Sequence, residues 1–146
     1  GRAFVLWMHA LNLVMSGRAN EAMPFIEEGW RLDRVVAPER YVSMFAYTGD
    51  VERSKNILSE LSLDQADPFY VAIGYLSLRE IDNTFKSIRI GIEEQSGILL
   101  LTLRSSQWWD PIRDDPRFDE MLELLDSKVT HTEQYLRDHN IEAKGQ

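Results

Sequence analysis

Small and large apolar side chains recur in a fixed order through residues 1–95. The order becomes visible when SGRANEA, TGDVERS and LREIDNT are aligned on Gly17, Gly49 and Arg79, which lie 32 and 30 residues apart. Small or medium side chains stand seven residues before and five residues after each anchor: Ala10, Val42 and Ala72, then Ala22, Ser54 and Thr84. Large ones stand four before and nine after: Leu13, Phe45 and Tyr75, then Ile26, Leu58 and Ile88. Because large side chains of one helix pack against small ones of the next, each unit is predicted to be a helix, a tight turn and a second helix.

Glycine and proline stand where such units need them. Gly17 and Gly49 fall in the turn between the two helices, where a positive φ is often required. Pro38 and Pro68 precede the leading helices of the second and third units, and proline is favoured in the first turn of a helix. The units are thus predicted to span about 1–34, 35–65 and 66–95 of a single all-α domain, 1–146.

This pattern resembles the tetratricopeptide repeat (TPR), whose signature combines Trp-x2-Leu-Gly-x2-Tyr with a later Ala-x3-Phe and Pro at a period of about 34 residues. The opening tryptophan of the signature is absent from each unit, and Arg79 replaces the turn glycine of the third. The resemblance implies a right-handed superhelix of helix-turn-helix repeats with C-terminal closing helices. An unrelated helical bundle is the alternative, although it would not repeat the small positions.

Residues 96–140 are predicted to close the array, with a flexible tail at 141–146. The apolar run from Ile98 to Ser106 is expected to be helical. Asp110-Pro111 and Asp115-Pro116 each offer a capping aspartate followed by a proline at the first helical position. An amphipathic helix is predicted by the spacing of three and four from Phe118 through Met121, Leu122, Leu125 and Val129.

The phrase DPIRDDPRFDEML resembles the segment that closes TPR arrays in bacterial regulatory proteins, where the array follows a nucleotidyl-cyclase or winged-helix domain. That resemblance implies that Trp108, Trp109 and Phe118 cover the apolar edge of the last repeat. The closing motif comprises Trp108, Trp109, Asp110, Pro111, Asp115, Pro116 and Phe118. The resemblance also implies that the chain is part of a larger regulatory protein.

Composition narrows the functions that this scaffold can serve. The 146 residues carry a net charge of −8 and no basic stripe, which argues against direct contact with nucleic acid. The chain has no cysteine, and its longest apolar runs are too short to span a membrane. We expect a cytoplasmic protein without a membrane segment.

Clustered aspartates raise the question of a calcium or magnesium site. Such loops usually carry a glycine, and none lies between Gly97 and Gly145. Arg113 and Arg117 are placed to neutralise the neighbouring carboxylates. Since phosphate-loop and hydrolase motifs are also absent from the sequence, we predict no metal, no cofactor, no catalytic residue and no enzymatic activity within this chain.

The predicted function is partner binding in the concave groove. In TPR arrays the first helix of each unit lines that groove, and the resemblance assigns to it Trp7, Leu11, Tyr47, Phe69 and Ile73. An apolar groove is not expected to stay open to water. It could be covered by an amphipathic helix or another segment of a protein or peptide partner, by the chain's own C-terminal helix, or by closer packing of the short array. We therefore expect a noncatalytic protein-interaction or scaffold domain. The alternative is a self-associating domain that dimerises next to a catalytic or DNA-binding domain outside this chain.

Overall fold

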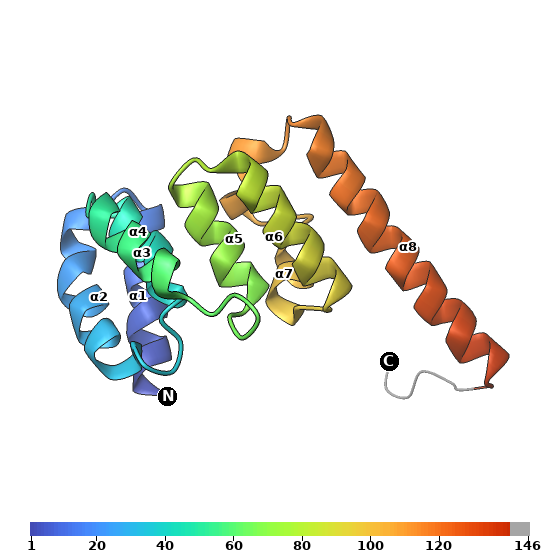
Figure 1. Cartoon of the computed structure of the whole chain (residues 1–146), viewed down its shortest axis with the longest axis horizontal. Helices are drawn as coiled ribbons and strands as arrows, with labels where there is room; N and C mark the ends of the chain where they lie inside the picture. Colours follow the sequence, from blue (N-terminus) through green and yellow to red (C-terminus); the bar gives the residue numbers. More distant parts are fainter. Residues whose placement is uncertain (141–146) are drawn as a thin grey trace.

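The protein is helical over residues 1–140, the part of the chain that the computed structural model describes. In chain order the helices are α1 (Arg2–Met15), α2 (Ala19–Asp33), α3 (Arg40–Tyr47), α4 (Val51–Glu60), α5 (Pro68–Ser77), α6 (Ile81–Glu93), α7 (Gly97–Thr102), the 3-10 helix η1 (Gln107–Ile112) and α8 (Pro116–Asp138). The all-α prediction is confirmed. The predicted tail, 141–146, lies outside the described residues. Figure 1 shows the helix pairs α1–α2, α3–α4 and α5–α6 following one another in chain order, with α8 projecting at the far end.

Three antiparallel helix pairs make up residues 2–93, and they coincide with the three units of the sequence alignment. Within each unit the two helices pack on each other: α1 on α2, α3 on α4, and α5 on α6. Units contact one another mainly through their first helices, since α3 packs on α5 and also meets α1 and α2. The chain is therefore a row of hairpins rather than a bundle around one axis.

The turns within the units share one backbone geometry. Gly17, Gly49 and Arg79 have φ values of 74°, 95° and 60°. In each turn the N–H of the following residue donates to the carbonyl four residues before the anchor, at 2.8, 2.8 and 3.0 Å. This is the bond that closes a helix C-terminus in the Schellman motif. The positive φ predicted for the two glycines is confirmed, and Arg79 adopts it despite its Cβ.

The repeated small positions form the contacts between helices. Their side chains are fully buried in all three units: Ala10, Val42 and Ala72, and Ala22, Ser54 and Thr84. The two hydroxyls among them are hydrogen-bonded to backbone, Ser54 Oγ to the carbonyl of Val42 at 2.5 Å and Thr84 Oγ1 to that of Glu80 at 2.9 Å. Burial of these groups therefore leaves no hydroxyl unsatisfied.

Glycines bring neighbouring units even closer. A Cβ on Gly74 of α5 would lie 2.8 Å from a methyl of Val42 in α3, and one on Gly91 of α6 would collide with Leu99 of α7. Close approach of this kind requires a residue without a side chain. The short array is consequently packed tightly along its length.

The closing segment differs from its prediction in two places. The run from Ile98 to Ser106 is helical only to Thr102, because the chain turns there and Ser106 caps the next helix by accepting a bond from Trp108 N–H at 3.3 Å. Asp110 and Pro111 consequently lie inside η1 and do not begin a helix. The carboxylate of Asp110 instead accepts from Arg113 Nε at 2.8 Å.

Helix α8 begins where the sequence predicts. Asp115 is its N-cap, accepting from Arg117 N–H at 3.0 Å, and Pro116 is the first helical residue. The Arg117 side chain holds the pKa of Asp115 below its usual range. Phe118, Met121 and Leu125 are buried on the side that meets α6, and no residue from 126 to 140 is buried.

Candidate functional site

The predicted groove residues lie inside the protein, apart from one. Trp7, Leu11, Phe69 and Ile73 are only 2–5% exposed, whereas Tyr47 is 37% exposed. All five belong to the first helices of their units, as the TPR resemblance implies, but they do not line an accessible surface together. The cover comes from the chain itself.

A continuous row of rings, here called the aromatic ladder, fills the position of the groove. It consists of Phe4, Trp7, Tyr70, Phe69 and Trp108. Successive ring centroids lie 6.1, 5.3, 5.0 and 5.3 Å apart. Edge-to-face and offset pairs at such distances are favourable beyond the area that they bury. The ladder joins the first unit directly to the third and the third to the closing segment, so rings of the same chain cover Trp7 and Phe69.

Polar groups hold the ladder in place from the second unit. Trp7 Nε1 donates to the backbone carbonyl of Arg40 at 2.9 Å. The guanidinium of Arg40 lies 5.8 Å from the centre of the Phe4 ring and 5.4 Å from that of Tyr70, within the range of a cation–π contact. Its Nη1 also pairs with the buried carboxylate of Asp33 at 2.8 Å. Burial raises the pKa of the Tyr70 hydroxyl, although Arg40 acts in the opposite direction.

This arrangement of Arg40, Asp33 and the rings favours a structural role over catalysis. Arg40 neutralises Asp33, and its guanidinium lies within cation–π range of the Phe4 and Tyr70 rings. Removing one partner of a buried ion pair commonly costs about 3–5 kcal/mol. Among residues 1–140 no cluster of three or more His, Asp or Glu side chains is placed to hold a metal ion.

The closing motif packs against the third unit. Trp109 is fully buried, with its ring 6.1 Å from that of Phe69, and its Nε1 donates to Thr102 at 3.2 Å. Trp108, half-buried, ends the ladder on the same phenylalanine. Phe118 is buried under the guanidinium of Arg113, 5.2 Å from its ring centre. Arg113 also donates to the Ser106 carbonyl at 2.6 Å, which fixes η1 to the start of α8.

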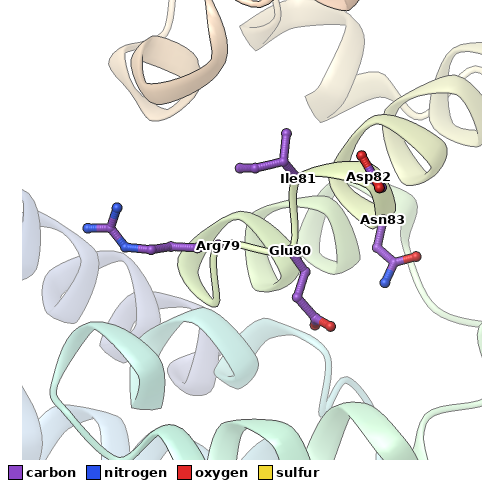
Figure 2. Close-up of a pocket in the computed structure, with 5 residues that line it drawn as sticks. All are labelled: Arg79, Glu80, Ile81, Asp82 and Asn83. Carbon is purple, nitrogen blue, oxygen red and sulfur yellow. The ribbon is translucent and has the colours of Figure 1, made fainter.

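The turn between α5 and α6 borders a hollow of about 390 Å³ that is lined by five successive residues, Arg79 to Asn83. Figure 2 shows the side chains of Arg79, Glu80 and Ile81 pointing in three different directions. A binding site needs polar groups that converge on one point. The hollow is therefore the outside of a turn, and we assign it no ligand.

The sequence predicted the apolar face of α8 through Val129 but assigned it to closing the array, and part of that face is exposed instead. Beyond Leu125 the helix separates from α6, and Figure 1 shows its C-terminal half standing away from the other helices. Val129 is 50% exposed and Tyr135 57% exposed on this half. Val129 and Leu136 continue the apolar spacing that begins with the buried Phe118. This spacing, visible in the sequence, extends further along α8 than the contact with α6 does.

A cleft lies where α6 ends and α8 continues. It has a volume of about 210 Å³ and is lined by Ile92, Gln95, Leu100, Leu125, Lys128, Val129, Thr132 and Glu133. The apolar members come from three helices, α6, α7 and α8. We refer to this hollow as the α8 cleft. It is distinct from the predicted groove, with which it shares no residue.

Comparisons of the chain with protein-family models, with curated proteins and with solved structures found no match. Within residues 1–140 no helix is both long and apolar enough to cross a bilayer.

Proposed function

We propose that this chain is a noncatalytic interaction module of the TPR type that binds another protein through the exposed half of α8. The repeated turn hydrogen bonds and the buried small positions support the TPR assignment. We further propose, from the closing motif, that the module belongs to a bacterial regulatory protein and acts in the cytoplasm, without a cofactor.

The observation that carries the binding role is the exposed apolar face of α8 beside the α8 cleft. Val129 borders the cleft while remaining half exposed, and the buried residues Phe118 and Leu125 precede it on the same helix. An apolar face that continues past its intramolecular partner is typical of helix-in-groove recognition. The predicted groove cannot serve this purpose while the aromatic ladder fills it.

A site-specific photo-crosslink tests this function. A benzophenone amino acid replaces Val129 in one protein and Val35, which is 88% exposed at the opposite end of the array, in another. After irradiation in extract of the source organism, mass spectrometry should find a protein joined to position 129 and not to position 35. Equal labelling from both positions, or none from 129, would refute the proposal.

The alternative of self-association has the same apolar face in its favour. A crosslink from position 129 to a second copy of this chain would replace the proposed partner with a homodimer. Sedimentation velocity over a range of protein concentrations provides the independent measurement, because a dimer changes mass with concentration and a monomer does not.

A further inference from the structure

Two copies of the chain match each other along the exposed half of α8. From the order of the side chains on this helix we infer that a second copy covers the surface when no other partner is bound, with the two α8 helices antiparallel. The inference goes beyond the proposed function, because this dimer needs no other protein. The two occupants exclude each other, so a partner that binds α8 would dissociate the dimer.

Helix α6 determines the orientation of the second copy. It packs on the first half of α8, where Phe118, Met121 and Leu125 are buried, whereas no residue from 126 to 138 is buried. A parallel second α8, paired residue by residue, would have to run along these three side chains, in the space that α6 fills. An antiparallel one overlaps only the exposed half, and its own packed half extends beyond the end of the first helix. Figure 1 shows the C-terminal half of α8 without a neighbouring helix.

The apolar stripe of the exposed half has the same spacing in both directions. Leu125, Val129, Thr132 and Leu136 follow one another at intervals of four, three and four residues. In an antiparallel pair centred on this stripe, Leu125 of each copy faces Leu136 of the other, and Val129 faces Thr132. Leucine thus meets leucine, and a β-branched side chain meets a β-branched one, at the spacing with which helices pack in coiled coils.

The α8 cleft receives one leucine of the second copy. Leu125 lines the cleft together with the apolar side chains of Ile92, Leu100 and Val129, around a volume of about 210 Å³. An apolar cavity of about 150 Å³ is known to take up benzene. Because Leu136 of the second copy faces Leu125, its side chain can enter this hollow. The symmetry of the pair fills the cleft of the other copy in the same way.

The one polar member of the stripe can be buried at little cost. Thr132 Oγ1 donates to the backbone carbonyl of Lys128 at 3.0 Å, one turn earlier in the same helix. The hydroxyl therefore already has its hydrogen-bond partner when the methyl group contacts Val129 of the second copy.

One pair of charges matches in the same register. Asp126 directly follows Leu125, and Arg137 directly follows Leu136, so both charges lie on the same side of the stripe. When the two leucines meet, Arg137 of the second copy stands beside Asp126, which also pairs with Arg104 of its own copy. Arg137 forms no ion pair of its own within residues 1–140. The two-fold symmetry provides this contact twice.

The dimer should be weak. The exposed half of α8 is about 20 Å long at 1.5 Å per residue and about 10 Å wide. A strip of this size falls short of the roughly 800 Å² that each partner buries in a standard interface. The net charge of −8 on each copy also opposes association. Self-association is therefore expected at protein concentrations of about 0.1 mM and above, and a partner with a larger contact would displace the second copy.

Disulfide formation between single-cysteine variants tests the register. The chain has no cysteine, so a disulfide in these variants joins two copies. Leu125→Cys and Leu136→Cys, mixed and oxidised, should form a crossed dimer, because the two positions face each other. Either variant alone should stay largely monomeric, since its two cysteines would lie about 16 Å apart along the helix, beyond the reach of a disulfide. A dimer of either variant alone, or no dimer in the mixture, would overturn the inference.

Sedimentation equilibrium measures the association without a change in the packed half of α8. Leu136→Lys places a charge where the apolar hollow expects leucine, so the dimer should weaken roughly tenfold or more. Leu63→Lys makes the same change at a side chain that is 53% exposed after α4, and it should associate like the unmodified chain. Circular dichroism verifies that both variants are folded. Equal effects of the two variants would overturn the assignment of the surface.

Charge reversal tests the ion pair. Arg137→Glu should weaken the dimer severalfold, and Asp126→Arg in the same chain should restore it, because the two charges are then exchanged. Arg89→Glu changes the net charge by the same amount on the exposed side of α6 and serves as the control. Equal weakening by Arg137→Glu and Arg89→Glu would mean that net charge alone acts, and the antiparallel register would lose this support.

Failure of the dimer can be distinguished from failure of the proposed function. The disulfide and sedimentation measurements use the purified chain, whereas the crosslink from position 129 uses extract. A chain that stays monomeric up to about 1 mM while position 129 captures a different protein would overturn the inference and leave the proposed function in place. A crossed disulfide without any captured protein would support the dimer and reject binding of another protein at this surface.

Discussion

The turn between α5 and α6 contains a residue that the other units avoid. Arg79 adopts a φ of 60°, where the first two units have Gly17 and Gly49. The left-handed conformation costs an L-residue about 1–2 kcal/mol, whereas glycine adopts it freely and instead loses about 0.5–1 kcal/mol more backbone entropy on folding. The Arg79 side chain is exposed and forms no ion pair within residues 1–140. Arg79→Gly should therefore raise the free energy of unfolding by about 0.5–1 kcal/mol.

Two further variants give this prediction its controls. Arg89 is an exposed arginine in the interior of α6, and Arg89→Gly should lower the free energy of unfolding by about 1 kcal/mol through helix propensity. Gly49→Ala introduces a Cβ that meets no atom within 4 Å, so only the backbone terms remain, and the free energy of unfolding should fall by about 0.5–1 kcal/mol. The same substitution, Arg→Gly, is thus expected to raise the free energy of unfolding at position 79 and to lower it at position 89.

Urea unfolding followed by circular dichroism measures these differences. In thermal unfolding, 1 kcal/mol should move the midpoint by about 2–4 °C for a chain near this size. If Arg79→Gly lowers stability as much as Arg89→Gly does, the conformational penalty assigned to position 79 is wrong. Position 79 would then not behave energetically like the glycine positions of the other two turns.

Three further predictions concern packing, burial and capping. In Gly74→Ala the new Cβ meets Val42 at 2.8 Å, which should cost about 1–3 kcal/mol of stability, and the higher helix propensity of alanine should offset about 1 kcal/mol of that cost. Gly97→Ala, which has open space around its Cβ, should not destabilise the protein in the same urea titration. Burial raises the pKa of Tyr41 to about 12, so the folded state keeps this proton while the unfolded state loses it near pH 10, and stability should fall between these values. Tyr41→Phe should reduce that fall in alkaline titrations, with no loss at pH 7, since the hydroxyl has no hydrogen-bond partner within residues 1–140. Asp67→Ala should cost about 1 kcal/mol in thermal unfolding, because the carboxylate caps α5 by accepting the backbone N–H two residues on at 2.9 Å; an unchanged midpoint would exclude that role.

Features set by neighbouring residues could be predicted from the sequence. Ala10 and Thr84 occupy positions whose size recurs at fixed offsets from the turn, and both are fully buried. Asp115 and Pro116 begin α8 because a cap and a fixed φ act within one turn of helix. The Asp110 cap was predicted on the same grounds and is wrong, since Ser106 starts η1 earlier in the chain.

The contents of the groove could not be predicted in this way. Trp7 and Tyr70 belong to units one and three, and their contact depends on how strongly the row of hairpins curves. That curvature follows from close approaches such as the one between Gly74 and Val42. The sequence identifies both glycine and tryptophan, but the angle between packed helices depends on many contacts together. Burial of the predicted groove residues is therefore a result of the three-dimensional packing.

The exposed half of α8 connects the stability of the fold to its proposed function. Isolated helices shorter than about 12–15 residues are marginal in water, because the first turn is costly to form. Residues 126–138 avoid that cost, since the packed turns around Phe118 and Leu125 already provide the nucleus and each further residue only extends the helix. Arg104 pairs with Asp126 at the point where the helix leaves the other helices. A partner helix would therefore meet an apolar stripe that is already helical, and binding would not have to supply the free energy of ordering it.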